Sequence, residues 1–335
     1  MREAMYYSSL GGDSVQCKLC PHRCTLNDGQ RGFCRVRECR GGKLYSLVYG
    51  LPCSAHIDPI EKKPMFHMLP TSKSFSIATA GCNSRCKFCQ NWQISQARPE
   101  DTDNIKLTPN QVVDDALKNT CRSIAYTYSE PNVFYEYMFD TARIARSKGV
   151  KNVWVTGGLI NTGPLRELAK YMDGANIDFK AFDDEYLRKV CGQNLKTITE
   201  TIKLSKELGI WIELTNLLVP TLNDDPKRIE GMAVWIKENV GAGVPLHFSR
   251  FWPMYKLKNL PPTPVRTLEK AREIAMNAGL EYVYIGNIPG HEANNTYCPS
   301  CKNLIIQRKG YVVSAIHIKD SGCRFCGHTI PGIWQ

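Results

Sequence analysis

Between residues 74 and 285, short apolar runs alternate with longer segments whose apolar residues recur at helical spacing. The short runs are rich in β-branched and aromatic residues, which is typical of buried strands. They predict strands at 74–79, 123–127, 152–156, 175–179, 211–219, 246–251 and 282–285. The segments between them, several preceded by Thr, Asn or Asp caps, predict helices at 112–117, 134–146, 164–171, 195–208, 226–240 and 267–278.

This repeated βα unit predicts an α/β fold. About six units fit a partial (β/α)6 barrel, in which reactive groups gather at the C-terminal ends of the strands. A doubly wound sheet has a similar periodicity and is the alternative. We expect three parts: a small Cys-rich metal-binding module at 1–66, the barrel core at 67–285, and a second Cys-rich module at 286–335.

The composition of the chain bears on its core, its cellular location and the state of its cysteines. With 335 residues and 43% apolar residues, the chain can bury a substantial core. It has no apolar stretch approaching the roughly 18 residues of a membrane span and no secretion signal at its start, so we expect a cytoplasmic protein. Its 15 cysteines would stay reduced there, and clustered ones are then metal ligands rather than disulfides. Isolated ones such as Cys121 and Cys191 are expected to be inert.

One cysteine group follows the first predicted strand. Cys82, Cys86 and Cys89 have the spacing Cys-x3-Cys-x2-Cys, with Phe88 before the last. This spacing suits three corners of a [4Fe-4S] cluster. The fourth iron is then open to an exogenous ligand, and S-adenosylmethionine can occupy it through its amino and carboxylate groups.

A second group forms two CxxC pairs separated by 21 residues: Cys298, Cys301, Cys323 and Cys326. Strand-like runs at 304–307 and 311–318 predict a hairpin that brings the pairs together. Four thiolates arranged in this way predict a zinc-ribbon-like module with a structural or substrate-docking role. An iron–sulfur cluster is the alternative.

A third group lies near the N-terminus and is less regularly spaced: Cys17, Cys20, Cys24 and Cys34. The surrounding segment is too short to bury a core of its own, so a metal site is expected to hold it together. Zinc is the expected metal, and another iron–sulfur cluster is the alternative. His22 is either a substitute ligand or a neighbour of the site.

The residues described so far resemble the radical S-adenosylmethionine (SAM) superfamily, and within it the pyruvate formate-lyase activating enzyme branch. The chain is more closely similar, over nearly its whole length, to the radical enzyme of the AmmeMemoRadiSam system in three segments: Cys17-Lys-Leu-Cys-Pro-His-Arg-Cys24, Asp58-Pro-Ile-Glu-Lys-Lys-Pro64 and Ala80-Gly-Cys-Asn-Ser-Arg-Cys-Lys-Phe-Cys-Gln-Asn-Trp92. The resemblance implies reductive cleavage of S-adenosylmethionine to a 5′-deoxyadenosyl radical that abstracts hydrogen from a substrate. It also implies a flavodoxin or ferredoxin type of reductant. The Asp58–Pro64 segment marks the subgroup but carries no mechanism.

The resemblance also assigns cofactor contacts. Ser129 and Glu130 stand where the family has a Gly-Gly-Glu-Pro turn that receives the cofactor's ammonium, although Tyr128 and Ser129 replace both glycines. Thr156 and Gly157 end the third strand, where relatives approach the cofactor. Val155 stands where the activating enzymes have an aspartate, which puts an associated cation site in doubt.

Later strands offer weaker candidates. Asp178 and Lys180 match a fourth-strand Asp-x-Lys pattern and are expected to bind the cofactor's carboxylate or ribose, or else to form a structural ion pair. Arg250 is a candidate for gripping a carboxylate or phosphate, and His247 for proton transfer. Phe88 is expected to flank the adenine, to shield the cluster or to belong to the core.

The substrate is not defined by the sequence. Activation of a protein by glycyl-radical formation is one interpretation, and modification of a peptide, a small metabolite or tRNA is another. The formal charge of +11 and the zinc-ribbon pattern raise a different class, a nucleic-acid-binding protein. Because the charge is dispersed apart from segments such as 31–40, nucleic acid is not the expected partner.

Overall fold

The centre of the molecule is a single eight-stranded sheet. The computed structural model describes residues 1–335. The strands of this sheet are β7 (Ser54–Pro59), β8 (Lys73–Ala78), β9 (Ser123–Tyr126), β10 (Lys151–Thr156), β11 (Gly174–Asp178), β12 (Trp211–Leu218), β13 (Leu246–Arg250) and β14 (Val283–Gly286). They lie in sequence order across the sheet; β8 to β14 run parallel, and only the edge strand β7 is antiparallel to its neighbour. All seven predicted strands are confirmed, and β7 is an addition.

Helices connect consecutive parallel strands. They are α2 (Pro109–Lys118), α3 (Tyr135–Ser147), α4 (Thr162–Ala169), α6 (Leu195–Glu207), α7 (Pro226–Asn239) and α8 (Val265–Asn277), with short α1 (Trp92–Ser95) and α5 (Asp184–Tyr186) between them. Local capping sets where several begin: the Thr108 hydroxyl accepts from the Gln111 amide, and the Asp225 side chain caps α7. The predicted helices are confirmed.

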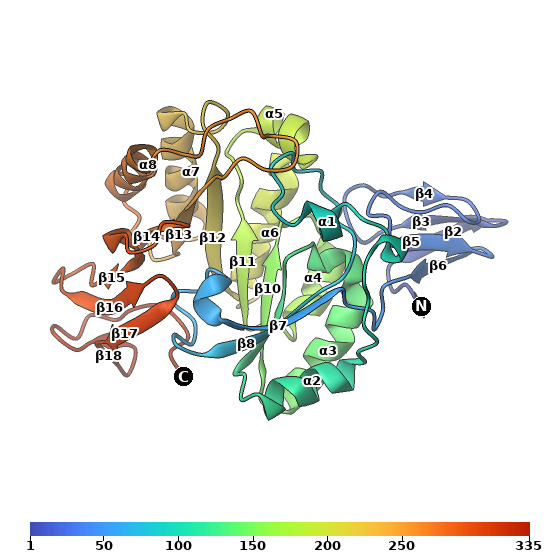
Figure 1. Cartoon of the computed structure of the whole chain (residues 1–335), viewed down its shortest axis with the longest axis horizontal. Coiled ribbons are helices and arrows are strands. Elements are labelled where there is room, and N and C mark those ends of the chain that lie inside the picture. The colour runs from blue at the N-terminus through green and yellow to red at the C-terminus, as the bar shows by residue number, and fades with distance from the viewer.

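The two faces of the sheet have different coverings. Ile124 and Trp154 pack with the helices, whereas their neighbours Ala125 and Val153 pack against the segment 60–69. Because strand side chains alternate between faces, the helices cover one face and this segment fills part of the other. The result is an open, partial (β/α)6 barrel rather than a sheet with helices on both faces (Figure 1).

Two small β modules lie at opposite ends of the long axis (Figure 1). The N-terminal module contains β1 (Arg2–Glu3), β2 (Tyr7–Gly11), β3 (Ser14–Cys17), β4 (Thr25–Leu26), β5 (Arg37–Arg40) and β6 (Lys43–Ser46). The C-terminal module contains β15 (Thr296–Tyr297), β16 (Leu304–Lys309), β17 (Val312–Ile316), β18 (Ile318–Lys319) and β19 (Gly322–Cys323). The predicted hairpin is β16 and β17.

Buried charged side chains join both modules to the barrel. Arg37 of the N-terminal module pairs with Glu136 of α3 at 2.5 Å, and Arg308 of β16 donates to the Phe66 carbonyl at 2.7 Å. Burial of a charged group is costly unless it is paired, so these contacts fix where each module sits. None of the helices combines the length and apolar character needed to cross a bilayer.

Candidate active site

A cavity of about 380 Å³ lies at the C-terminal ends of the central strands. It brings together most of the residues that the sequence singled out as cofactor contacts. Those that line it are Cys82, Cys86, Phe88, Cys89, Ser129, Glu130, Thr156, Gly157, Asp178 and Lys180. These residues come from four consecutive strand ends, β8 to β11, as expected for a barrel of this class.

The cysteine loop after β8 presents three thiols to this cavity. The Ser84 amide donates to Cys82 Sγ at 3.3 Å, and Cys89 Sγ lies 3.2 Å from Ser95 Oγ. Burial raises the pKa of Cys82. A hydrogen bond from the Cys191 thiol lowers the pKa of Cys86. No fourth cysteine lines the cavity, so a cube bound here keeps one iron without a thiolate.

The turn after β9 is held in an unusual backbone conformation. Tyr128 has φ +64°, in the left-handed region that glycine normally occupies and that costs another residue roughly 1 kcal/mol or more. Its hydroxyl donates to the Asp58 carboxylate, which also accepts from Lys63 Nζ at 2.6 Å and Lys62 Nζ at 2.8 Å. Through this network the Asp58–Pro64 segment fixes the side chain that replaces the first glycine of the turn, which is a physical role that the sequence did not reveal.

Glu130 is the buried acid of the site. Its carboxylate accepts from Thr156 Oγ1 at 2.6 Å, from the Gly157 amide at 2.8 Å and from the Asn132 amide at 3.2 Å. Burial raises its pKa to about 7, although these donors oppose the shift. A cation placed against this carboxylate would stabilise its ionised form, which is what binding an ammonium group requires.

Polar atoms without partners line the same cavity. Ser129 Oγ and Gln193 Oε1 are buried and have no hydrogen-bond partner within the protein. Gly157 lies between Glu130 and Gln193: a Cβ there would come within 2.8 Å of Gln193 Nε2 and 3.1 Å of Glu130 Oε2. Since buried polar atoms are costly when unpaired, these atoms favour a polar ligand at this wall.

Asp178 and Lys180 form an ion pair at the end of β11. Burial opposes a charge on Lys180, but the negative charges of Asp178 and of a Cys86 thiolate outweigh it and raise its pKa, so the lysine stays cationic. Both residues line the cavity. The sequence left open whether these two residues form a structural ion pair or contact the cofactor. The structure shows the ion pair, and both side chains also line the cavity.

Two of the sequence candidates lie elsewhere. Arg250 does not line the cavity: its Nε donates to the Thr263 carbonyl at 2.8 Å, and its guanidinium lies over the Trp252 ring. His247 is buried and lies 2.7 Å from Glu213, inside the core. Neither side chain lines the cavity. The structure therefore does not support the cofactor contact predicted for Arg250 or the proton transfer predicted for His247.

Sequence reasoning missed many of the other lining residues, and Gln193 and Tyr311 are two informative examples. Gln193 follows a π-helical turn at Leu187–Cys191 and Gly192, whose φ is +65°. Gly192 is the one feature of the sequence that could have indicated the end of this helical turn. Tyr311 lies at the turn of the C-terminal hairpin and reaches the cavity although it is far from it in sequence. No local pattern indicates that contact.

The C-terminal cysteines form a compact set. Cys298 Sγ lies 3.6 Å from Cys326 Sγ, and Cys301 Sγ lies 3.7 Å from Cys323 Sγ. All four sulfurs lie within 4.8 Å of one another. A zinc–sulfur distance of about 2.3 Å gives a tetrahedron with edges of about 3.8 Å, so the set fits one zinc ion.

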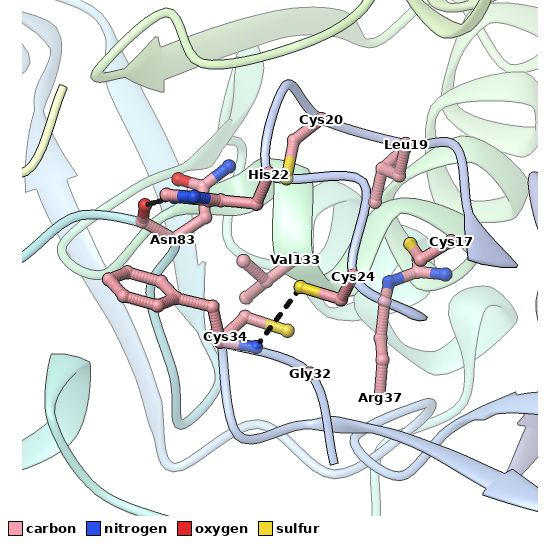
Figure 2. A pocket seen from close by; sticks show the side chains of 11 residues that line it. Cys17, Leu19, Cys20, His22, Cys24, Gly32, Cys34, Arg37, Asn83 and Val133 are labelled. Atoms are coloured by element: carbon pink, nitrogen blue, oxygen red, sulfur yellow. Dashed lines mark hydrogen bonds between the residues drawn. The ribbon is translucent and has the colours of Figure 1, made fainter. Parts of the chain in front are cut away.

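The N-terminal cysteines line a separate pocket together with His22 and Arg37 (Figure 2). His22 Nε2 lies 2.7 Å from the carbonyl of Asn83, the residue after Cys82. The fold therefore does bring the N-terminal cysteines together, as the sequence predicted, next to the loop that carries Cys82, Cys86 and Cys89.

The comparisons with known proteins agree with this geometry. A sequence family described as the radical SAM superfamily matches residues 76–232. An uncharacterized protein of Methanocaldococcus jannaschii is 48% identical over 98% of this chain and 99% of its own length. The pyruvate formate-lyase-activating enzyme of Clostridium pasteurianum is 25% identical over 47% of this chain and 66% of its own. A radical SAM methyltransferase from Sphaerobacter thermophilus has a similar fold, with a TM-score of 0.53 and 15% identity over 71% of both chains.

Proposed function

The chain belongs to the radical SAM superfamily and is related to its activating enzymes, and we propose that it is an enzyme that uses S-adenosylmethionine to take a hydrogen atom from a substrate. One observation carries the proposal: three thiols and a buried acid line one cavity, and no fourth cysteine does. The residues present fit the cofactor set that the family implies.

The chain's own residues have separable roles in this proposal. Cys82, Cys86 and Cys89 hold the cluster. Glu130 receives the cofactor's ammonium, and Ser129 offers an unpartnered hydroxyl beside it. Lys180, kept cationic by Asp178, faces a carboxylate or ribose oxygen. When bound, the cluster supplies one electron to the sulfonium, and methionine and 5′-deoxyadenosine are the products.

The far side of the cavity is proposed to hold the substrate. Ser249, Asn287 and Tyr311 line it and carry no formal charge. A neutral, hydrogen-bonding wall suits a peptide backbone, and the relationship to activating enzymes favours a glycine within a protein. A small metabolite and tRNA are the competing outcomes, and the resemblance to the AmmeMemoRadiSam radical enzyme leaves the choice among them open. A flavodoxin or ferredoxin is the proposed electron donor.

The test starts from full-length protein reconstituted without oxygen. Given S-adenosylmethionine and dithionite, it should release 5′-deoxyadenosine and methionine in equal amounts. Deuterated candidate substrates, beginning with proteins that copurify from the native host, should then transfer deuterium into 5′-deoxyadenosine. Protein that holds the cluster at Cys82, Cys86 and Cys89 but releases no 5′-deoxyadenosine would contradict the proposal.

A further inference from the structure

Four cysteines of the N-terminal module surround one enclosed pocket. Cys17 ends β3, Cys20 and Cys24 lie in the loop after it, and Cys34 precedes β5. Figure 2 shows the four side chains around the same space. Gly32 also lines the pocket, next to the Cys24 and Cys34 sulfurs.

A buried cation with two unpartnered N–H donors points to an anionic occupant. Arg37 lines the same pocket and is 2% exposed. Its Nη2 donates to Glu136, but Nε and Nη1 have no partner. Leaving two donors of a buried guanidinium unsatisfied is costly, whereas a metal centre bound by four thiolates is a net anion that would accept from them. The pocket therefore favours an anionic group beside Arg37.

The distances between the sulfur atoms distinguish a cluster site from a site for a single metal ion. The C-terminal quartet is the one set of three or more Cys, His, Asp or Glu whose ligand atoms all lie within 4.8 Å of one another. The N-terminal thiols do not meet that limit, and neither do Cys82, Cys86 and Cys89. Thiolates at the corners of an iron–sulfur cube lie about 6 Å apart because each binds a different iron. The N-terminal thiols are thus not gathered as closely as one zinc ion requires, a feature that they share with the thiols of Cys82, Cys86 and Cys89.

The pocket shares a wall with the catalytic loop. Asn83 lines it, while the preceding residue, Cys82, lines the catalytic cavity. On the other side of Cys82, Gly81 has φ +93°, and a Cβ there would lie 2.6 Å from the Cys34 carbonyl oxygen. The two cysteine groups thus touch through consecutive residues of one loop.

We propose that Cys17, Cys20, Cys24 and Cys34 hold a second iron–sulfur cluster, with Arg37 donating hydrogen bonds to it, in place of the zinc ion that the sequence favoured. The site does not depend on the proposed function, because it is built by different residues.

Metal content tests this directly. Full-length protein reconstituted without oxygen with iron, sulfide and zinc should contain about eight irons per chain, from two four-iron clusters, and one zinc. The variant Cys82→Ala/Cys86→Ala/Cys89→Ala should keep about four irons, a broad visible absorbance and, after reduction, a cluster paramagnetic resonance signal. The variant Cys20→Ala/Cys34→Ala should also keep about four irons, held by the catalytic loop. Cys39, buried in β5 outside the pocket, provides a matched control, and Cys39→Ala should keep all the iron.

Two zinc ions in the wild type, or a catalytic-loop variant that holds zinc but no iron, would overturn the second cluster. Mössbauer spectra of the wild type give the same information without any substitution, since the iron must resolve into two clusters rather than one. Failure to cleave S-adenosylmethionine would contradict the proposed function alone, because the iron retained by the catalytic-loop variant does not depend on turnover.

Discussion

The two walls of the catalytic cavity differ in chemistry. The wall formed by the ends of β8 to β11 carries three thiols, the buried acid Glu130 and the Asp178–Lys180 ion pair. The wall formed by β12 to β14 and the C-terminal hairpin carries neutral residues: Thr215, Leu217, Ser249, Asn287 and Tyr311. The radical SAM match ends at residue 232, before the last three of these.

The contrast between the walls supports the proposal that cofactor binding and substrate capture are separated in space. Charged groups and thiols are concentrated on the first wall, and hydrogen bonds fix the positions of several of them. The neutral wall has fewer fixed contacts, and Tyr311 is half exposed. Changes to the first wall should therefore affect cofactor chemistry, and changes to the second should affect substrate capture.

The largest effect is expected from Cys86→Ala. Loss of one of three thiolates removes a corner of the cluster, so release of 5′-deoxyadenosine should fall below detection. Cys121→Ala, which removes a buried thiol outside both pockets, should keep activity near that of the wild type. The measurement is chromatographic quantification of 5′-deoxyadenosine. Substantial product from Cys86→Ala would contradict the proposal that Cys86 holds a corner of the cluster.

Glu130→Gln should have the next largest effect. A hydrogen bond to a charged group contributes about 1.5–3 kcal/mol, so the affinity for S-adenosylmethionine should fall about 10- to 100-fold. Equilibrium binding to the reconstituted protein measures this loss. Ser129→Ala provides a comparison at the neighbouring position and should cost less than about tenfold, since it removes a neutral group. Unchanged affinity in Glu130→Gln would mean that the ammonium binds elsewhere.

The same carboxylate should make cofactor binding depend on pH. Its pKa is raised to about 7 by burial, and only the ionised form can pair with an ammonium group. The affinity for S-adenosylmethionine should therefore rise with pH, by roughly tenfold per unit below pH 7, and level off above it. Glu130→Gln should flatten this profile between about pH 5 and pH 8. A wild-type affinity that is constant over this range would show that Glu130 does not titrate in the free protein.

Gly157→Ala should have an intermediate effect. The new Cβ would meet Gln193 and Glu130 at 2.8 Å and 3.1 Å, which should lower the free energy of unfolding by about 1–3 kcal/mol and displace the acid. Gly163→Ala in α4 is the control, because no atom lies within 4 Å of its Cβ position. Denaturant unfolding measures the difference, and equal stability of the two variants would indicate that the space beside Glu130 is not constrained.

The smallest effect on cofactor chemistry is expected from Tyr311→Ala on the neutral wall. Cleavage of S-adenosylmethionine without substrate should change by less than about twofold, because the side chain is half exposed and belongs to a different module from the thiols. Transfer of deuterium from the true substrate should fall more. A collapse of cleavage in the absence of substrate would show that the two walls are not separable.

Much of the barrel could be predicted from the sequence. Apolar runs and helix caps are local signals, and they located the strands and helices that place the first wall. The Cys82–Cys89 spacing also singled out a loop whose three cysteines line the cavity, because three cysteines in one loop leave a local pattern. Glu130 and Gly157 came from the resemblance to a known family.

Long-range contacts could not be predicted in this way. The side-chain network that holds Tyr128 at φ +64° joins residues about 70 positions apart, and Tyr311 reaches the cavity from a separate module. For the N-terminal cysteines, the spacing indicated a metal site but not its type, because the spread of the thiols depends on the fold. Arg250 was assigned to the cofactor from its strand alone, and the fold directs it to Thr263 instead.

Paramagnetic resonance of the catalytic cluster gives the most direct test of cofactor binding at the iron that no thiolate holds. In the Cys20→Ala/Cys34→Ala variant, where only the loop from Cys82 to Cys89 can hold a cluster of this kind, the reduced protein should change its signal when S-adenosylmethionine is added. Label at a carboxylate oxygen of the cofactor should then couple to the cluster. An identical signal with and without the cofactor would contradict the assignment of this cavity.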